Sequence, residues 1–268
     1  MRPRLLASMV LLFGHAAHAG TTCRNAPIGP AEVSRATDAA LATQHVLDGR
    51  GDRVALIARI GQDLSRYGLK YSHVAFVVRD HPDGRWTVVH LLNECGTDHS
   101  DIYAEGLVNF YADGLVSDET AIVWLDAALG ERLGLALAGT RPTRLHEPRY
   151  SAIARPDSPS YQNSTSWVLE MLELEMRERP IGEGRAAAHR LLAADAFVPD
   201  VIEIPYLERL AGAVGAPNVS FVDHPLAARL GGHYRVVTVD SIFRFLAQRR
   251  AVAGRIDFDA AHAAEPRS

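Results

Sequence analysis

Residues 71–93, "YSHVAFVVRDHPDGRWTVVHLLN", decide the fold because they have the pattern of a β-hairpin. Two runs rich in β-branched residues flank the turn-forming cluster at 81–84, which is a strong short-range signal for two antiparallel strands. We predict that residues 73–79 pair with residues 86–92. Because both faces of the two strands are largely apolar, we expect the strands to lie inside a sheet.

The register of this hairpin determines which side chains share a face. If the loop holds an even number of residues, odd positions of the first strand face the same side as even positions of the second. His73 and His90 then share a face with Ala75, Val77 and Val88. A loop one residue longer or shorter would separate the two histidines. Each imidazole lies among apolar neighbours and needs a partner, so it is either a hydrogen-bonded core residue or a functional group.

The rest of the chain alternates helical and extended patterns. Apolar spacing predicts helices at residues 30–47, 166–179, 186–194, 207–214 and 240–249. Extended patterns occur at residues 121–129, 198–206 and 234–239, while residues 53–60 fit either a strand or a buried helical turn. These patterns predict an α+β fold in one domain, residues 20–250, with a mainly antiparallel sheet packed against the 166–179 helix. Residues 251–268 are predicted to be a flexible tail.

The N-terminus has the pattern of a secretory signal peptide over residues 1–19. Arg2 and Arg4 precede an apolar run over residues 5–13, and small residues follow at 17–19. The apolar run is shorter than the roughly 20 residues that span a bilayer. We expect cleavage after Ala19, a periplasmic or secreted protein, and no integral membrane segment in the mature chain.

Charge and motifs limit the classes of partner. Without residues 1–19 the chain keeps 26 of its 28 basic residues and all 32 acidic ones, a net charge of −6, which argues against a nucleic-acid partner. No phosphate-binding glycine motif follows a predicted strand, so we expect no nucleotide cofactor. The spacing of Glu94, Asp98, His99 and Asp101 matches no specific zinc or calcium pattern, so we predict no metal site.

The sequence contains two cysteines, Cys23 and Cys95. In an oxidising compartment an even number of cysteines predicts a disulfide, which would tie the mature N-terminus to the core. The alternative is a free, nucleophilic Cys95, since His90 and His99 are close to it in sequence. The compartment favours the disulfide.

Residues 161–172, "YQNSTSWVLEML", place several small polar side chains at the start of a predicted helix. Asn, Ser and Thr are the preferred helix caps, so capping alone explains residues 163–166. A helix start also stabilises a developing negative charge, which suits a nucleophile. Both interpretations of the stretch remain open on the residues alone.

Three short motifs occur in a characteristic order: "SHVAF" at 72–76, "VVHLLN" at 88–93 and "NSTSWVLEML" at 163–172. Together they resemble the circularly permuted papain-like hydrolases, whose relatives include the lecithin:retinol acyltransferase group and bacterial YiiX-type hydrolases. Those proteins carry a base on the first strand, a His or Glu on a nearby strand, and an Asn-Cys motif that opens a helix. Residues 55–78 and 88–97 also resemble an uncharacterised family of exported bacterial proteins, domain of unknown function 2145.

The resemblance implies a permuted papain-like fold and a role for each matching residue. His73 would be the general base, His90 would orient it, and Ser164 would stand at the nucleophile position. Ser72, Asn163 and Thr165 would support them. The chain departs from the pattern at Ser164, because a serine hydroxyl depends on its base far more than a thiol does.

Two functions follow from this resemblance. The first is an exported acyl-transfer hydrolase that cleaves an amide or ester, with cell-wall peptides or lipid acyl groups as the suggested substrates. The second is a catalytically inactive periplasmic binding or assembly protein that keeps the hydrolase fold.

Overall fold

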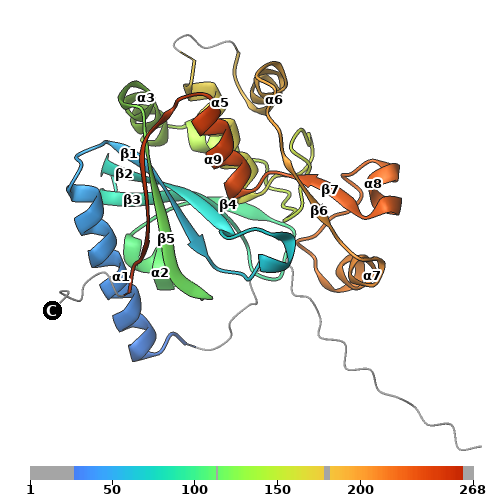
Figure 1. The fold of residues 1–268 in the computed structure, drawn as a ribbon, viewed down its shortest axis with the longest axis horizontal. Coiled ribbons are helices and arrows are strands. Elements are labelled where there is room, and N and C mark those ends of the chain that lie inside the picture. The colour runs from blue at the N-terminus through green and yellow to red at the C-terminus, as the bar shows by residue number, and fades with distance from the viewer. Residues whose placement is uncertain (1–26, 113, 178–181, 262–268) are drawn as a thin grey trace, which may run out of the picture.

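A six-stranded antiparallel sheet forms the centre of the computed structural model, which describes residues 27–112, 114–177 and 182–261 (Figure 1). Its strand order is β4-β3-β2-β1-β5-β8. The strands are β1 (Val54–Ile60), β2 (His73–His81), β3 (Gly84–Asn93), β4 (Ser100–Glu105), β5 (Ser117–Leu125) and β8 (Val252–Asp259). The predicted α+β class is therefore confirmed. The segment that fitted either a strand or a helical turn is β1, which lies between β2 and β5.

The predicted hairpin is β2–β3, and its predicted register is confirmed. Val77 lies opposite Val88, and the strands close on a two-residue loop at 82–83. Because that loop is even, His73 and His90 share one face of the sheet, as the sequence predicted.

The two faces of the sheet pack against different helices (Figure 1). One face contacts α3 (Ala127–Leu137), α5 (Ser164–Glu175) and α9 (Val239–Gln248), and Phe76 meets Trp167 edge to face at 5.7 Å. The other face contacts α1 (Pro30–Asp48) and α2 (Leu107–Ala112). Covering both faces explains why β1, β2 and β3 have runs of buried residues without polar alternation.

The central helix α5 differs from its prediction in bounds and in burial. It begins at Ser164 and ends at Glu175, not over 166–179. Glu170 and Glu173 stand apart from the apolar stripe of Trp167, Val168, Met171, Leu172 and Leu174, and this spacing predicts a solvent-facing side for them. That prediction is wrong, because both side chains are fully buried. α6 (Arg185–Ala194) and α9 cover this side of α5. Packing with distant parts of the chain therefore buries the side that was expected to face solvent.

A smaller unit lies beyond the end of the main sheet, at the right of Figure 1. It consists of the two-stranded sheet β6–β7 with α7 and α8 on its outside. The bounds are β6 (Asp200–Glu203), α7 (Tyr206–Gly215), α8 (Leu226–Gly231) and β7 (His233–Val236). Two short elements complete the chain: η1 (Ser65–Tyr67) and α4 (Arg141–Arg144). A separate apolar cluster around Tyr234 and Ile153 joins the unit to the loop that leads into α5.

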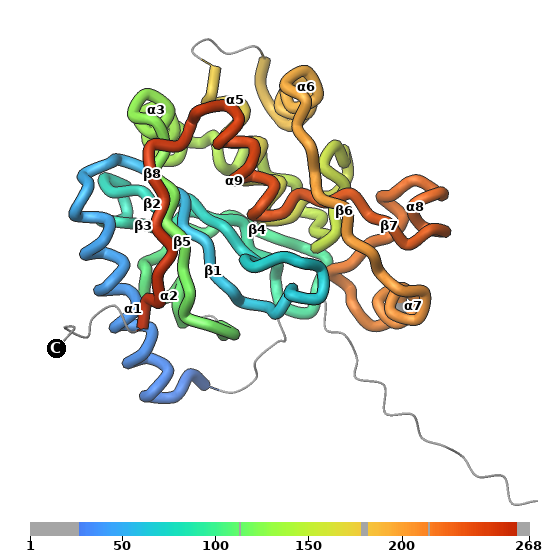
Figure 2. Tube along the Cα trace, viewed as in Figure 1, coloured from blue at the N-terminus to red at the C-terminus, as the bar shows by residue number. Residues whose placement is uncertain are grey.

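The predicted flexible tail is wrong for residues 252–259, which form β8. This strand pairs with β5 at the edge of the sheet (Figure 2). In this pairing Ile256 lies opposite Ile122. The Tyr71 hydroxyl also donates a hydrogen bond to Asp257, at 2.6 Å. These contacts come from parts of the chain far away in sequence, so the weak local pattern of 252–259 does not show them.

Several predictions fall outside the described residues. They are the signal peptide at 1–19, the cysteine Cys23 and the last residues of the tail, 262–268. The pairing of Cys23 with Cys95 therefore stays a prediction. Among the helices that are described, none is long and apolar enough to cross a bilayer.

We expect β8 to contribute strongly to stability. A chain ending at Ala251 should lose at least about 3 kcal/mol of unfolding free energy, because it loses the β5 ladder, the Tyr71 bond and the buried Ala260. Urea denaturation followed by circular dichroism measures the change. A chain ending at Ala261 is the control and should match the full chain. Equal midpoints for both truncations would contradict the role of β8.

Candidate functional site

The centre of the candidate site is a chain of contacts across three neighbouring strands. His73 on β2 and His90 on β3 are joined by a hydrogen bond of 2.9 Å between Nε2 and Nδ1. His90 Nε2 lies 3.1 Å from a carboxylate oxygen of Glu105 on β4. Glu105 is opposite Val88 and so faces the same side of the sheet as His90. From the middle of the sheet toward its β4 edge, the order is His73, His90, Glu105.

Glu105 was not identified from the sequence. It is the last residue of β4, and that strand lacks a clear alternating pattern. Its contact with His90 depends on the β3–β4 register, which the sequence does not specify. The role of such a residue could have been expected, because a base that is oriented by a second imidazole often has a further polar group that orients that imidazole. The sequence did not show which residue fills this role.

The contacts favour one tautomer for each ring. The negative charge of Glu105 favours a proton on His90 Nε2, which leaves His90 Nδ1 as an acceptor. His73 Nε2–H then donates to that acceptor, and His73 Nδ1 keeps its lone pair. The chain of contacts thereby orients His73 with a proton-accepting nitrogen available, which is the state that a general base requires.

The surroundings of His73 keep it neutral. Burial is the largest cause that lowers the pKa of His73 well below 6.5, and the positive charge of Arg59 and the neighbouring His90 lower it further. Phe110 of α2 packs near both rings, with centroids 6.1 Å from His73 and 6.0 Å from His90. The Arg59 guanidinium lies over the same Phe110 ring, 4.6 Å from its centroid. His73 is 8% exposed and His90 is fully buried.

Ser164 occupies the first position of α5, and its neighbours perform the capping. The Asn163 side chain accepts from the backbone N–H of Ser166, and the Ser166 hydroxyl accepts from the backbone N–H of Asn163, both at 2.9 Å. The capping interpretation is thus correct for Asn163 and Ser166. Within the described chain, the Ser164 hydroxyl makes no hydrogen bond, so capping does not account for Ser164.

The other two supporting residues have structural partners. Thr165 donates to the backbone carbonyl of Val237 at 2.8 Å, which fixes the helix start against the segment before α9. The Ser72 hydroxyl accepts from the backbone N–H groups of Gly61 and Gln62, at 2.8 and 3.1 Å. Ser72 therefore holds the turn after β1, directly beside His73, and its hydroxyl forms no hydrogen bond with either imidazole within the described chain.

A series of hydrogen bonds ties the start of α5 to the end of β3. Asn163 donates from its side chain to the carbonyl of Ala152 at 3.1 Å, and Ala152 N–H donates to the carbonyl of Asn218 at 2.8 Å. Asn218 then donates from its side chain to Asn93, the last residue of β3, at 3.1 Å. The helix start is consequently fixed at the end of the sheet near His90.

The sequence predicted that His73, His90 and Ser164 meet, and the structure shows the first two meeting. The histidines lie on the face covered by α1 and α2, whereas the apolar residues of α5 pack on the opposite face. In the part of the chain that is described, no hydrogen bond joins Ser164 to either imidazole. Contact between the nucleophile and its base stays a prediction.

A buried carboxylate on α5 holds the preceding loop. Glu170 accepts from Gln162 at 2.7 Å and from Arg185 at 3.1 Å, and lies 2.9 Å from His189 Nε2. Gln162 belongs to the segment that leads into α5, so the cluster fixes this segment against α5 and α6. With its oxygens satisfied by these partners, Glu170 has a structural role.

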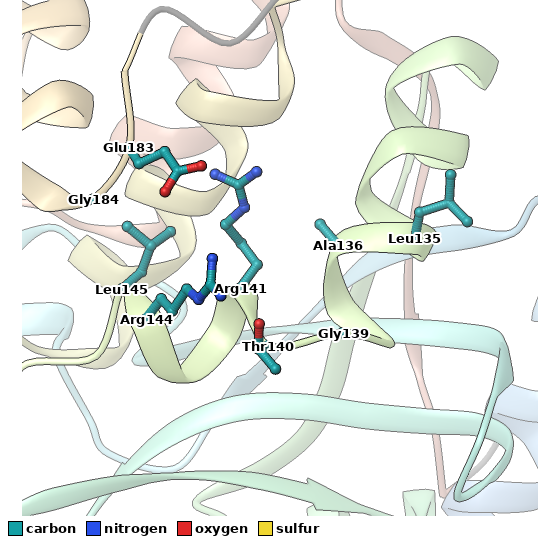
Figure 3. Close-up of a pocket in the computed structure, with 9 residues that line it drawn as sticks. All are labelled: Leu135, Ala136, Gly139, Thr140, Arg141, Arg144, Leu145, Glu183 and Gly184. Atoms are coloured by element: carbon teal, nitrogen blue, oxygen red, sulfur yellow. The ribbon is translucent and has the colours of Figure 1, made fainter.

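Two cavities lie away from these residues. One of about 400 Å³ lies between α3, α4 and residues 183–184, and Figure 3 shows the side chains of Arg141, Arg144 and Glu183 around it. Another, of about 330 Å³, is lined by Glu32, Arg35 and residues 115–118. Neither is lined by a candidate site residue.

The loop after β3 satisfies its own polar groups. Asn93 donates to the carbonyls of Thr97 and His99, and His99 Nδ1 lies 2.8 Å from Asp98. Over the described residues, no group of three or more His, Cys, Asp or Glu side chains is arranged to hold a metal ion. The described part also contains no free cysteine, so it does not support the alternative in which Cys95 is a free nucleophile.

Comparison with known families gives one match. The model of an uncharacterised protein family conserved in bacteria, DUF2145, matches residues 46–246, which run from the last turn of α1 to the last turn of α9. The chain belongs to the DUF2145 family. Neither the curated proteins nor the solved structures gave a match. The membership places β2, β3 and α5 of this DUF2145 protein inside the matched region, and it carries no assigned activity.

The low pKa of His73 predicts a pH-dependent stability. Below about pH 6.5 the unfolded chain binds a proton at His73 that the folded chain does not, so the unfolding free energy falls as pH falls. One such group contributes a slope of up to about 1.4 kcal/mol per pH unit. His146 and His224 also have lowered pKa values and add to the slope in the same direction.

The variant His73→Gln isolates this contribution. Urea denaturation at pH 7.5, 6.5 and 5.5 gives the unfolding free energy at each pH. Its slope against pH should be smaller for His73→Gln than for the unmodified protein, by up to about 1.4 kcal/mol per pH unit. The exposed His99→Gln variant is the control and should keep the full slope. If His73→Gln and the unmodified protein had the same slope, the burial of a neutral His73 would be contradicted.

Proposed function

We propose that this DUF2145 protein is an acyl-transfer hydrolase in which Ser164 is the nucleophile and His73 the general base. The observation that carries the proposal is the chain of contacts from Glu105 through His90 to His73. It supplies an oriented base of the kind that a serine nucleophile requires. A permuted papain-like arrangement of β2, β3 and α5 is part of the same proposal.

The reaction proceeds through an acyl-enzyme. The first step requires the Ser164 hydroxyl to come within hydrogen-bond reach of His73. His73 Nδ1 then takes the hydroxyl proton while the oxygen attacks the carbonyl carbon of an ester or amide. The backbone N–H groups at the start of α5 stabilise the resulting oxyanion. His73 then returns the proton to the leaving alcohol or amine, and water attacks the acyl-serine by the same steps in reverse.

The surroundings of His73 limit the rate that we expect. Its low pKa makes the imidazole a weak base, and the positive charge of Arg59 opposes the imidazolium that forms during attack. The carboxylate of Glu105 offsets this effect through His90. A thiol ionises more readily than a hydroxyl, so such a base would suit a cysteine better than a serine.

The competing function is a non-catalytic periplasmic binding or assembly protein. The observation that favours it is the placement of the imidazoles under Phe110, on the face opposite the packing face of α5. A histidine pair retained only for packing would show this same burial. The two functions differ in whether Ser164 reacts.

The proposal predicts covalent labelling of Ser164 by a fluorophosphonate probe, detected by intact mass and peptide mapping. Ser164→Ala should abolish the adduct, and His73→Gln should slow labelling by about 100-fold or more because the hydroxyl loses its base. Ser160→Ala, a partly exposed serine in the preceding loop, is the control and should label normally. An adduct that survives Ser164→Ala would exclude Ser164. Reaction of Ser164→Cys alone with a thiol-directed acyl probe would indicate a binding protein that has lost catalysis.

The role of Glu105 is tested by Glu105→Gln. The amide removes the charge that favours a proton on His90 Nε2, so His73 loses its preferred tautomer, and Ser164 labelling should slow by about 100-fold. Thermal unfolding should change little, since Glu105 is partly exposed. Glu119→Gln, an exposed carboxylate on β5, is the matched control. Equal labelling rates for the unmodified protein and Glu105→Gln would refute the orienting role.

A further inference from the structure

The helices α7 and α8 turn their apolar sides toward solvent. Six large apolar side chains on these helices and the segment between them are between 55% and 75% exposed. They are Tyr206, Leu207, Leu210, Val222, Leu226 and Leu230. An amphipathic helix on a globular protein normally buries this side, and a contiguous exposed apolar surface marks an interaction site.

The polar side of α7 is the side that faces the protein. Glu208 forms an ion pair with Arg66 of η1 at 2.8 Å, and Arg209 donates to the carbonyl of Ile204 at 2.5 Å. Gly212 lies against the ring of Phe221. Positions 208, 209 and 212 lie together on a helical wheel, opposite Leu207 and Leu210. The exposure of the leucines therefore follows from how α7 is anchored.

The helix α8 continues the same surface. Arg209 Nη2 lies 3.5 Å from the carbonyl of Leu230, which joins the two helices. Leu226 and Leu230 are four residues apart and so share one side of α8. Figure 1 shows both helices on the outside of the β6–β7 sheet, away from the main sheet. We call these six side chains the α7–α8 face.

The charges around this face favour an anionic partner. Three acidic groups of the unit are already engaged: Asp200 by Arg244, Glu208 by Arg66, and Asp223 by the Arg155 N–H and the Ser158 hydroxyl.

Two arginines remain available for a partner. Arg229 and Arg235 are exposed and contact no carboxylate within the described ranges. Glu203 is the one exposed carboxylate of this unit that contacts no arginine there. The unpaired charge is thus positive, although the chain as a whole is acidic.

We propose that the α7–α8 face docks on the surface of an anionic phospholipid bilayer. Apolar side chains with an aromatic residue and flanking arginines are the composition of helices that lie in the membrane interface. The leucines would enter the boundary between headgroups and acyl chains, and the arginines would contact lipid phosphates. The proposal does not depend on the chemistry of Ser164.

Vesicle sedimentation tests the proposal on the chain without residues 1–19 and with Ser164→Ala, which removes any turnover. We expect binding to vesicles of phosphatidylethanolamine and phosphatidylglycerol, and weaker binding to pure phosphatidylcholine. Leu207→Ser with Leu230→Ser should weaken binding by about tenfold or more, because two apolar anchors are lost. Leu41→Ser with Leu135→Ser, exposed leucines on α1 and α3, is the matched control and should bind normally.

A second pair of variants tests the electrostatic part. Arg229→Gln with Arg235→Gln should weaken binding to phosphatidylglycerol vesicles by about tenfold and leave binding to phosphatidylcholine unchanged. Arg144→Gln with Arg190→Gln makes the same charge change elsewhere and should have no effect. Absence of binding to every vesicle, or equal binding by the two leucine pairs, would overturn the proposal. A lipid-free dimer that Leu207→Ser with Leu230→Ser dissociates would assign the face to a second copy instead.

Discussion

The register of the β2–β3 hairpin is the constraint on which the rest of this structure depends. A two-residue turn fixes it, and the alternation of side chains then sends Val74, Phe76 and Val78 to one helical layer and His73 to the other. A slip of β2 by one residue would turn His73 toward the α5 side and away from His90, and would turn Phe76 away from Trp167. The turn at 82–83 thus determines which side chains of β2 and β3 enter the apolar cluster on each face of the sheet. Because both clusters are filled by these side chains, a shifted register would be costly.

The polar groups of the site are stable in this sheet because they satisfy one another. Two imidazoles without partners would be costly among apolar neighbours, but here each ring is paired, and the outermost contact is a carboxylate that is still partly exposed. Arg59 adds a positive charge beside them and donates to the carbonyl of Phe110. Burial and the positive charge of Arg59 keep His73 uncharged. The carboxylate of Glu105 is connected to His73 through His90.

The sequence was most informative where the pattern was local. The turn at 82–83 and the β-branched runs were sufficient to place His73 and His90 together, and the helices α1, α6, α7 and α9 lie within two residues of their predicted bounds. Predictions from the sequence were wrong or incomplete where the structure depends on contacts between residues far apart in the chain.

Three failures have this same origin. Glu105 reaches His90 only through the β3–β4 register, β8 is held by β5, and Glu170 is buried because α6 supplies its partners. The capping of α5 was open to two interpretations, since Asn163 and Ser166 act as a reciprocal pair that the usual Glu or Gln signature does not include. In each case the missing information was the identity of a neighbour.

The hydrogen bonds from Asn163 through Ala152 and Asn218 to Asn93 have a mechanical consequence. Asn218 lies three residues after the end of α7, so the outer unit and the start of α5 share one set of bonds. Two hydrogen bonds, from Ala152 to Asn218 and from Asn163 to Ala152, connect the residues after α7 to the residue before Ser164. The backbone before Ser164 is therefore held by the segment after α7 and by the end of β3. How rigidly these segments are held determines how well Ser164 keeps one orientation.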